Sequence, residues 1–200
     1  ATVAPGKGAT GKLMSLKMTI RIRGSVLCLL TIIICDILHA QDFTFYYNGI
    51  FYGCYVTDHI KHEARLQCEN RKVEGAVFPP SYVEYQGIEY KIISISGFKS
   101  KNITHITIPS TVKEIDYGQI WYCGFLQTVF IGANVKSIDE SSFSGCSSLR
   151  EIRIDANNKR YRTLNGVLYS KRLDTLFCIP SGLTGTLTIP QCVRAVAVGY

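Results

Sequence analysis

The sequence predicts a β-rich solenoid in which each turn of about 23 residues carries one short parallel strand. The first observation is a repeat: "ITHITI" at 103–108, "LQTVFI" at 126–131 and "LREIRI" at 149–154 begin 23 residues apart. The second is that the first, fourth and sixth positions of each segment are apolar, as in a strand with one buried face. The third is an apolar pair that follows, such as Val112 and Ile115. Strands of successive turns then stack about 4.8 Å apart in a parallel sheet.

The repeat extends in both directions from these three turns. Downstream, "LTIPQCVRAV" at 187–196 restores the apolar positions after an insertion at 157–182. Upstream, the segment "AVFPP" at 76–80 has Phe78 and Pro79 at apolar positions of the repeat. The pattern predicts one row of adjacent, buried positions on parallel strands: Ile106, Val129, Ile152 and Leu187.

Residues 1–40 have the layout of a leader with a secretory signal peptide. A cationic stretch ending at Arg23 precedes an apolar run from Ser25 to Cys35, and Ala40 is the best cleavage point. The run is about a dozen residues long, whereas a membrane span needs about 20, so we expect no membrane span in the mature chain. "PGKGATGKL" at 5–13 looks like a phosphate-binding loop, but Leu13 stands where such a loop needs Ser or Thr. A segment removed on export cannot serve as a nucleotide site.

Loss of the leader also lowers the net charge. Residues 41–200 carry 17 Lys and Arg against 14 Asp and Glu, a net charge of about +3, and no single stretch is strongly basic. The sequence therefore gives no electrostatic footprint for nucleic-acid binding. The expected organisation is an N-terminal β-hairpin cap region at 41–75, followed by the repeats at 76–200 with their insertion. The last repeat is expected to continue beyond Tyr200.

Two repeat segments, "ITIPSTVKEI" at 106–115 and "SSFSGCSSL" at 141–149, resemble the unit of the BspA-type leucine-rich repeat. The insertion is similar to a hairpin often spliced between such repeats, and "DFTFYYNGIFYGCYV" at 42–56 resembles a hairpin that opens many members. The resemblance covers about residues 42–200 and departs at Ile120, in the usual Phe place, and at Ser100, in the Cys place. It implies a leucine-rich-repeat solenoid, secreted or attached to the cell surface, that adheres to host or matrix proteins or to other cells.

Six cysteines follow the leader. Cys123 and Cys146 lie 23 residues apart, and a spacing of about 4.8 Å is wider than the roughly 3.8 Å between the β-carbons of a relaxed disulfide. We therefore expect a buried, unpaired ladder there. Cys54 and Cys68 would face each other if a hairpin turned near Lys61, either as a cross-strand disulfide or as a reduced pair. The sequence leaves the pairing of Cys178 and Cys192 open.

The sequence offers no set of catalytic, metal or cofactor ligands. His105 is the one histidine within the repeats, and spacing assigns it no Ser, Cys or Asp partner. His59 and His62 lie between Cys54 and Cys68, but a hairpin would place both at its turn and both cysteines far back along the strands, which argues against zinc. We expect no enzyme activity, no metal and no cofactor.

Function is instead expected from the outward face of the strands. Residues between the buried positions tile one face of the sheet: His105, Thr107, Thr128, Phe130, Glu151, Arg153, Thr186 and Thr188. Solenoids use such faces to bind proteins, and Phe130 beside Arg153 is the most anchor-like pair because aromatic residues and Arg dominate interface energies. The expected partners are extracellular-matrix or cell-surface proteins. The alternative is a passive spacer that displays another domain beyond residue 200.

Overall fold

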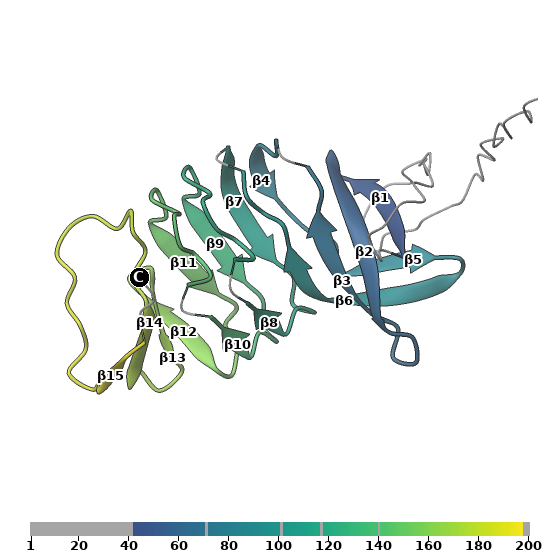
Figure 1. Ribbon diagram of the computed structural model, residues 1–200. Coiled ribbons are helices and arrows are strands. Elements are labelled where there is room, and N and C mark those ends of the chain that lie inside the picture. The colour runs from purple at the N-terminus through teal and green to yellow at the C-terminus, as the bar shows by residue number, and fades with distance from the viewer. Residues whose placement is uncertain (1–41, 71, 101, 117, 140, 198–200) are drawn as a thin grey trace, which may run out of the picture.

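The computed structural model describes residues 42–70, 72–100, 102–116, 118–139 and 141–197. Their strands stack one after another along a single axis, from the N-terminal strands at one end to the C-terminal strands at the other (Figure 1). Within these ranges no helix is long and apolar enough to cross a membrane. The expected leader, its cleavage point at Ala40 and the repeat end at Tyr200 lie outside the described residues.

The described chain opens with a five-stranded sheet. Its strands are β1 (Phe43–Tyr47), β2 (Ile50–Asp58), β3 (Glu63–Cys68), β5 (Tyr82–Tyr85) and β6 (Ile88–Ser96). They lie in the order β1-β2-β3-β6-β5, with β3 and β6 parallel and the other neighbours antiparallel. This sheet therefore takes strands from both sides of residue 75.

Two-residue turns join three of the antiparallel pairs. Asn48 and Gly49 have φ values of 49° and 76°, and Gln86 and Gly87 have 53° and 77°. The insertion repeats the arrangement with Asn165 and Gly166 between β12 (Tyr161–Leu164) and β13 (Val167–Ser170). Positive φ at both central residues is the type I′ geometry that matches strand twist, and Asn-Gly is its preferred sequence.

The repeats form a parallel sheet in the order β11-β9-β7-β4. Its strands are β4 (Gly75–Val77), β7 (Ile103–Ile108), β9 (Thr128–Ile131) and β11 (Glu151–Ile154). Ile106 pairs with Val129, and Val129 with Ile152, as the 23-residue spacing requires. A second parallel pair, β8 (Glu114–Ile115) and β10 (Ser137–Ile138), lies at the trailing apolar positions. A turn thus contains two strands where the sequence indicated one.

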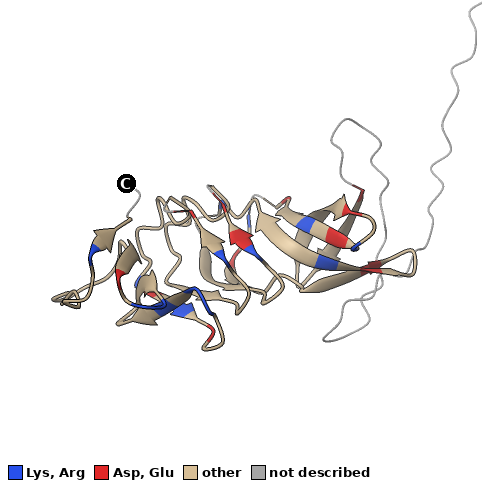
Figure 2. Ribbon diagram, turned by 90° about the horizontal axis from the view of Figure 1, so that it is seen from below, with Lys and Arg blue, Asp and Glu red and all other residues tan. Residues whose placement is uncertain are grey.

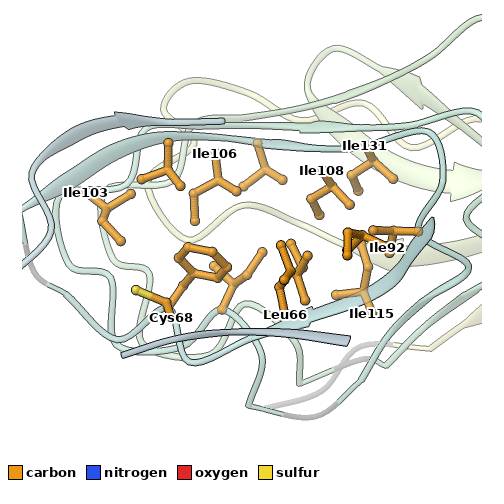
Figure 3. Close-up of a cluster of buried hydrophobic side chains, with 14 of the residues drawn as sticks. Leu66, Cys68, Ile92, Ile103, Ile106, Ile108, Ile115 and Ile131 are labelled. Atoms are coloured by element: carbon orange, nitrogen blue, oxygen red, sulfur yellow. The ribbon is translucent and has the colours of Figure 1, made fainter. Parts of the chain in front are cut away.

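The core lies between these layers. Figure 3 shows isoleucines of the parallel sheet facing side chains from the other layer across the interior. Ile103, Ile106, Ile108 and Ile131 lie on one side, and Leu66, Ile92 and Ile115 on the other; all are at most 1% exposed. One cluster of buried residues runs from Phe43 to Leu168, so the N-terminal sheet and the repeats share one core.

The C-terminal strands differ from the expected repeat. β12 and β13 join β14 (Thr175–Cys178) and β15 (Ala195–Val196) in a separate sheet. The β12–β13 turn lies against the edge of β11, where the Ile152 N–H donates to the Gly166 carbonyl at 2.9 Å. The expected stacking of Leu187 on Ile152 is therefore wrong: Leu187 lies outside any strand, half-buried against the cluster of Val167, Tyr169 and Leu176.

The upstream register is also shifted by one residue. Val77, not Phe78, pairs with Ile106 and is 1% exposed, while Phe78 is 52% exposed. A bulge between Gly75 and Ala76 accounts for the shift. Because side chains alternate along a strand, this single slip moves Phe78 from the core to the outward face.

Candidate strand-face binding site

The outward face of β7, β9 and β11 carries two rows of side chains. One row is His105, Thr128 and Glu151, and the other is Thr107, Phe130 and Arg153. Each row crosses three adjacent strands, because the parallel pairing keeps equivalent positions in register. Six of the eight expected surface residues therefore share one face.

Phe130 and Arg153 are direct neighbours across β9 and β11. The Arg153 guanidinium lies 2.8 Å from a carboxylate oxygen of Glu151, two residues earlier on the same strand, and the two side chains are 62% and 39% exposed. The hydrogen bond and the charge of Glu151 raise the pKa of Arg153, and an Arg side chain is cationic at neutral pH in any environment. Phe130 is half-buried and lies between Thr107 and Arg153 in its row. The pair presents an aromatic ring beside an oriented, solvent-accessible cation.

Thr186 and Thr188 do not belong to this face. Both are exposed, but they lie in a segment without a strand, outside the four-stranded sheet. Their expected position depended on Leu187 pairing with Ile152, and the β12–β13 turn occupies that edge.

Phe78 is a surface residue that the sequence reasoning missed. Its neighbours Ala76 and Val77 pair with His105 and Ile106, so Phe78 follows them on the side that faces outward. It adds a 52% exposed aromatic ring at the β4 end of the face. The sequence did contain a residue that could have revealed this, because Val77 is also apolar and fits the buried position. The repeat spacing, however, favoured Phe78, the residue before Pro79, for that position.

A second group of aromatic residues, of which Tyr122 and Phe125 are exposed, lies in the loop before β9. This loop has Trp121, Tyr122 and Phe125 where the next turn has Ser144, Gly145 and Ser148. Tyr122 and Phe125 are 61% and 58% exposed. Tyr122 has a φ of 53°, a left-handed conformation that suits the equivalent Gly145 better. The sequence showed a departure at Ile120 but not this surface.

Cys54 and Cys68 do not face each other as expected. Cys54 lies opposite Leu66, and Cys68 lies opposite Tyr52, because the β2–β3 hairpin turns about one residue earlier than Lys61. Both are buried and free. Burial raises the pKa of the Cys54 thiol.

The expected ladder of Cys123 and Cys146 is confirmed, since both are fully buried and free. Their thiols also act as hydrogen-bond donors: Cys123 Sγ lies 3.4 Å from the Phe98 carbonyl, and Cys146 Sγ lies 3.7 Å from that of Ile120. Ser100, in the same place one turn earlier, donates to the Val73 carbonyl at 2.6 Å. A hydrogen bond with Cys146 and burial raise the pKa of Cys123. This position therefore links each turn to the one before it.

The described residues contain no group of three or more His, Cys, Asp and Glu placed to hold a metal ion. His59 and His62 are exposed at the β2–β3 turn, while Cys54 and Cys68 are buried. His105 Nδ1 lies 2.9 Å from the hydroxyl of its neighbour Thr104 on the exposed surface.

Comparison with solved structures returns bacterial leucine-rich-repeat proteins. One from Bacteroides ovatus is 24% identical, with 77% of this chain and 41% of that chain covered and a TM-score of 0.49. One from Eubacterium ventriosum is 19% identical, with coverages of 75% and 54% and a TM-score of 0.31. A leucine rich cell surface protein from Faecalibacterium prausnitzii is 13% identical, with coverages of 76% and 66% and a TM-score of 0.37. This chain thus matches between 41% and 66% of the length of these structures.

No curated protein matches the chain. The family model described as the BspA type leucine rich repeat region matches residues 81–183, in six copies. This stretch is more than half of the 200 residues, and it includes the stacked turns, the ladder cysteines and the β12–β13 insertion. The chain therefore belongs to the BspA-type leucine-rich repeat family.

Proposed function

We propose that this chain is a secreted or cell-surface protein that binds protein ligands, rather than an enzyme. The ligands belong to the extracellular matrix or to the surface of other cells. The export layout of residues 1–40 and the family membership support this location and this class of function. Stacked repeats supply a broad, continuous face, which is how solenoids recognise proteins.

The observation that carries the proposal is the row that contains Phe130 and Arg153. An aromatic ring and an Arg are the side chains most often found at the energetic centre of protein interfaces. Here they are neighbours on two adjacent strands of a sheet with a fully packed interior, so the pair is held in place without the partner. Phe78 extends the apolar character of the same face toward β4.

The test is binding of the purified protein to a panel of matrix proteins and intact cells. Phe130→Ala and Arg153→Ala should each weaken binding by about 1 kcal/mol or more, roughly fivefold in Kd. Both should leave the thermal midpoint nearly unchanged, because neither side chain lies in the core. Tyr46→Ala and Arg150→Ala are matched controls, as both residues are exposed and lie outside the strand face.

Two outcomes would contradict the proposal. Equal binding by the wild type and the Phe130→Ala/Arg153→Ala double variant would move the site away from the strand face. An absence of binding across the panel would favour the spacer, the alternative role in which the repeats only display another domain.

A further inference from the structure

Basic side chains gather on the insertion hairpin, away from the strand face. All five are exposed, and we call them the basic hairpin surface: Lys159, Arg160, Arg162, Lys171 and Arg172. Figure 2 shows Lys and Arg positions concentrated on the β12–β13 hairpin, whereas basic and acidic positions are interspersed elsewhere.

Folding brings two short basic runs together. In the sequence, residues 159–162 and 171–172 are separated by residues 163–170, so neither run is strongly basic by itself. In the hairpin Tyr161 pairs with Ser170, and the Lys171 N–H donates to the Arg160 carbonyl at 2.8 Å. Lys136 of the preceding turn lies close to this surface, because its carbonyl accepts a hydrogen bond from Arg160 Nε at 3.5 Å. The Lys136 residue is also exposed.

The positive charge of this surface is only partly balanced locally, by the interaction of the Asp174 carboxylate with Arg172. None of residues 156–173 is acidic. The flanking carboxylates have other hydrogen bonds: Asp155 Oδ1 accepts from the Asn157 N–H at 2.9 Å, and Asp174 Oδ1 from the Ser170 hydroxyl at 2.6 Å. Among the described residues, the ion pairs involve Lys61, Lys113 and Arg153 and none of the five hairpin cations. A concentrated cationic surface of this kind attracts a polyanion.

The side chains around the cations narrow the class of polyanion. Single-stranded nucleic acids need exposed aromatic rings for base stacking, but Tyr161 and Tyr169 are only 6% and 0% exposed. Insertion into a membrane surface needs exposed apolar side chains beside the cations, and residues 159–172 contain no exposed large hydrophobic side chain. Electrostatic attraction to anionic lipid headgroups is therefore the one membrane contact left, and the vesicle experiment below tests it. Three of the five cations are Arg, whose planar guanidinium can bind a sulfate or carboxylate with two hydrogen bonds.

We propose that the basic hairpin surface binds a sulfated polysaccharide. The leader layout supports this class of ligand over nucleic acid, because an exported protein meets anionic polysaccharides outside the cell. This site is separate from the strand face, and it gives the protein a second, purely electrostatic contact.

The probe is a fully sulfated heparin octasaccharide, titrated calorimetrically into the full chain at several salt concentrations. The logarithm of the binding constant should fall linearly with the logarithm of salt concentration, because each contact releases counterions. The Arg162→Gln/Arg172→Gln variant should bind at least tenfold more weakly at about 0.1 M salt, with a shallower salt slope by roughly one unit per contact removed. This variant keeps the contacts of Arg160 Nε with Lys136 and of Lys171 Nζ with Ala156.

The matched control is Lys61→Gln/Lys72→Gln, which removes the same charge from the N-terminal part and should bind like the wild type. Phe130→Ala/Arg153→Ala should also bind the octasaccharide normally, so the two sites can fail independently. Equal affinity of the Arg162→Gln/Arg172→Gln variant and the wild type would overturn the proposal. So would equal binding of a desulfated octasaccharide, or tighter binding of oligothymidine or of phosphatidylserine vesicles.

Discussion

Of two adjacent asparagines in the insertion, Asn158 is buried and Asn157 is exposed. Asn158 is 1% exposed, and its side-chain amide donates to the carbonyls of Gly132 and Val135, both at 3.1 Å. Its side-chain oxygen accepts from the N–H groups of Arg160 and Tyr161, both at 2.9 Å. Asn157 is exposed, and its side-chain amide donates to the nearby Asp155 carboxylate at 3.1 Å. The buried asparagine thus fastens the start of the insertion to the preceding turn.

We expect Asn158→Ala to lower the free energy of unfolding by about 3 kcal/mol, because it leaves buried carbonyls and N–H groups without partners. Asn157→Ala should change it by no more than about 0.5 kcal/mol. Urea denaturation followed by circular dichroism measures both. Similar stabilities for the two variants would mean that water replaces the side chain of Asn158 at no cost.

Residue-scale prediction from the sequence succeeded where a position repeats. The buried positions Ile106, Val129 and Ile152 and the thiols of Cys123 and Cys146 follow from the 23-residue spacing alone. Phe78 could not be placed, because a bulge shifts the register by one residue and "VFP" fits either way. The basic hairpin surface could not be predicted from the sequence either, because its two basic runs lie next to each other only in the folded hairpin.

At the scale of the elements, the stacking distance of successive turns depends on small residues at the points of closest approach. Gly132 directly follows β9, and a Cβ there would lie 2.6 Å from Ser110 Cα and 2.7 Å from the Pro109 carbonyl oxygen. Those atoms are backbone and cannot move aside as a side-chain end can. Gly124, in the same turn, has its nearest contact at 3.9 Å from the Ser147 hydroxyl.

Gly132→Ala should therefore destabilise the protein by about 2 kcal/mol, as overpacking does in a closely packed core. Gly124→Ala is the matched control and should stay within about 0.5 kcal/mol of the wild type. Thermal or urea unfolding of the two variants makes the comparison. A neutral Gly132→Ala would show that the turns can separate at this point without loss of packing.

Elements were predicted well where the chain only repeats and poorly where it changes direction. The spacing indicated β7, β9 and β11, and the hairpin turns carry the Asn-Gly pairs that favour them at residues 48–49 and 165–166. The strand expected at Leu187 does not form beside β11, because the β12–β13 turn of the insertion occupies the free edge of β11. No local pattern reports which of two distant segments will pair with a free edge.

At the scale of the whole molecule, the described chain has two hydrophobic clusters of unequal size. The larger one joins the N-terminal sheet to the stacked turns, while the smaller one contains the buried residues Val167, Tyr169 and Leu176. Solenoid stability is the sum of each turn's own stability and its contacts with neighbours, so a weakly packed end can open by itself. Here β15 has two exposed residues and pairs with β14 alone.

Native-state hydrogen exchange should therefore resolve two levels of protection. The paired amides of β7 and β9, which have strand neighbours on both sides, should exchange at least a hundredfold more slowly than those of β14 and β15, a difference of about 2.7 kcal/mol in opening free energy. Leu176→Ala should speed exchange in β13–β15 and leave β7 and β9 unchanged, because Leu176 belongs to the smaller cluster. Val129→Ala should speed exchange in β7, β9, β11 and the N-terminal sheet together, since these strands share the larger cluster. If Leu176→Ala accelerated every strand equally, the described chain would instead unfold as one cooperative unit, and its two clusters would not be separate units of stability.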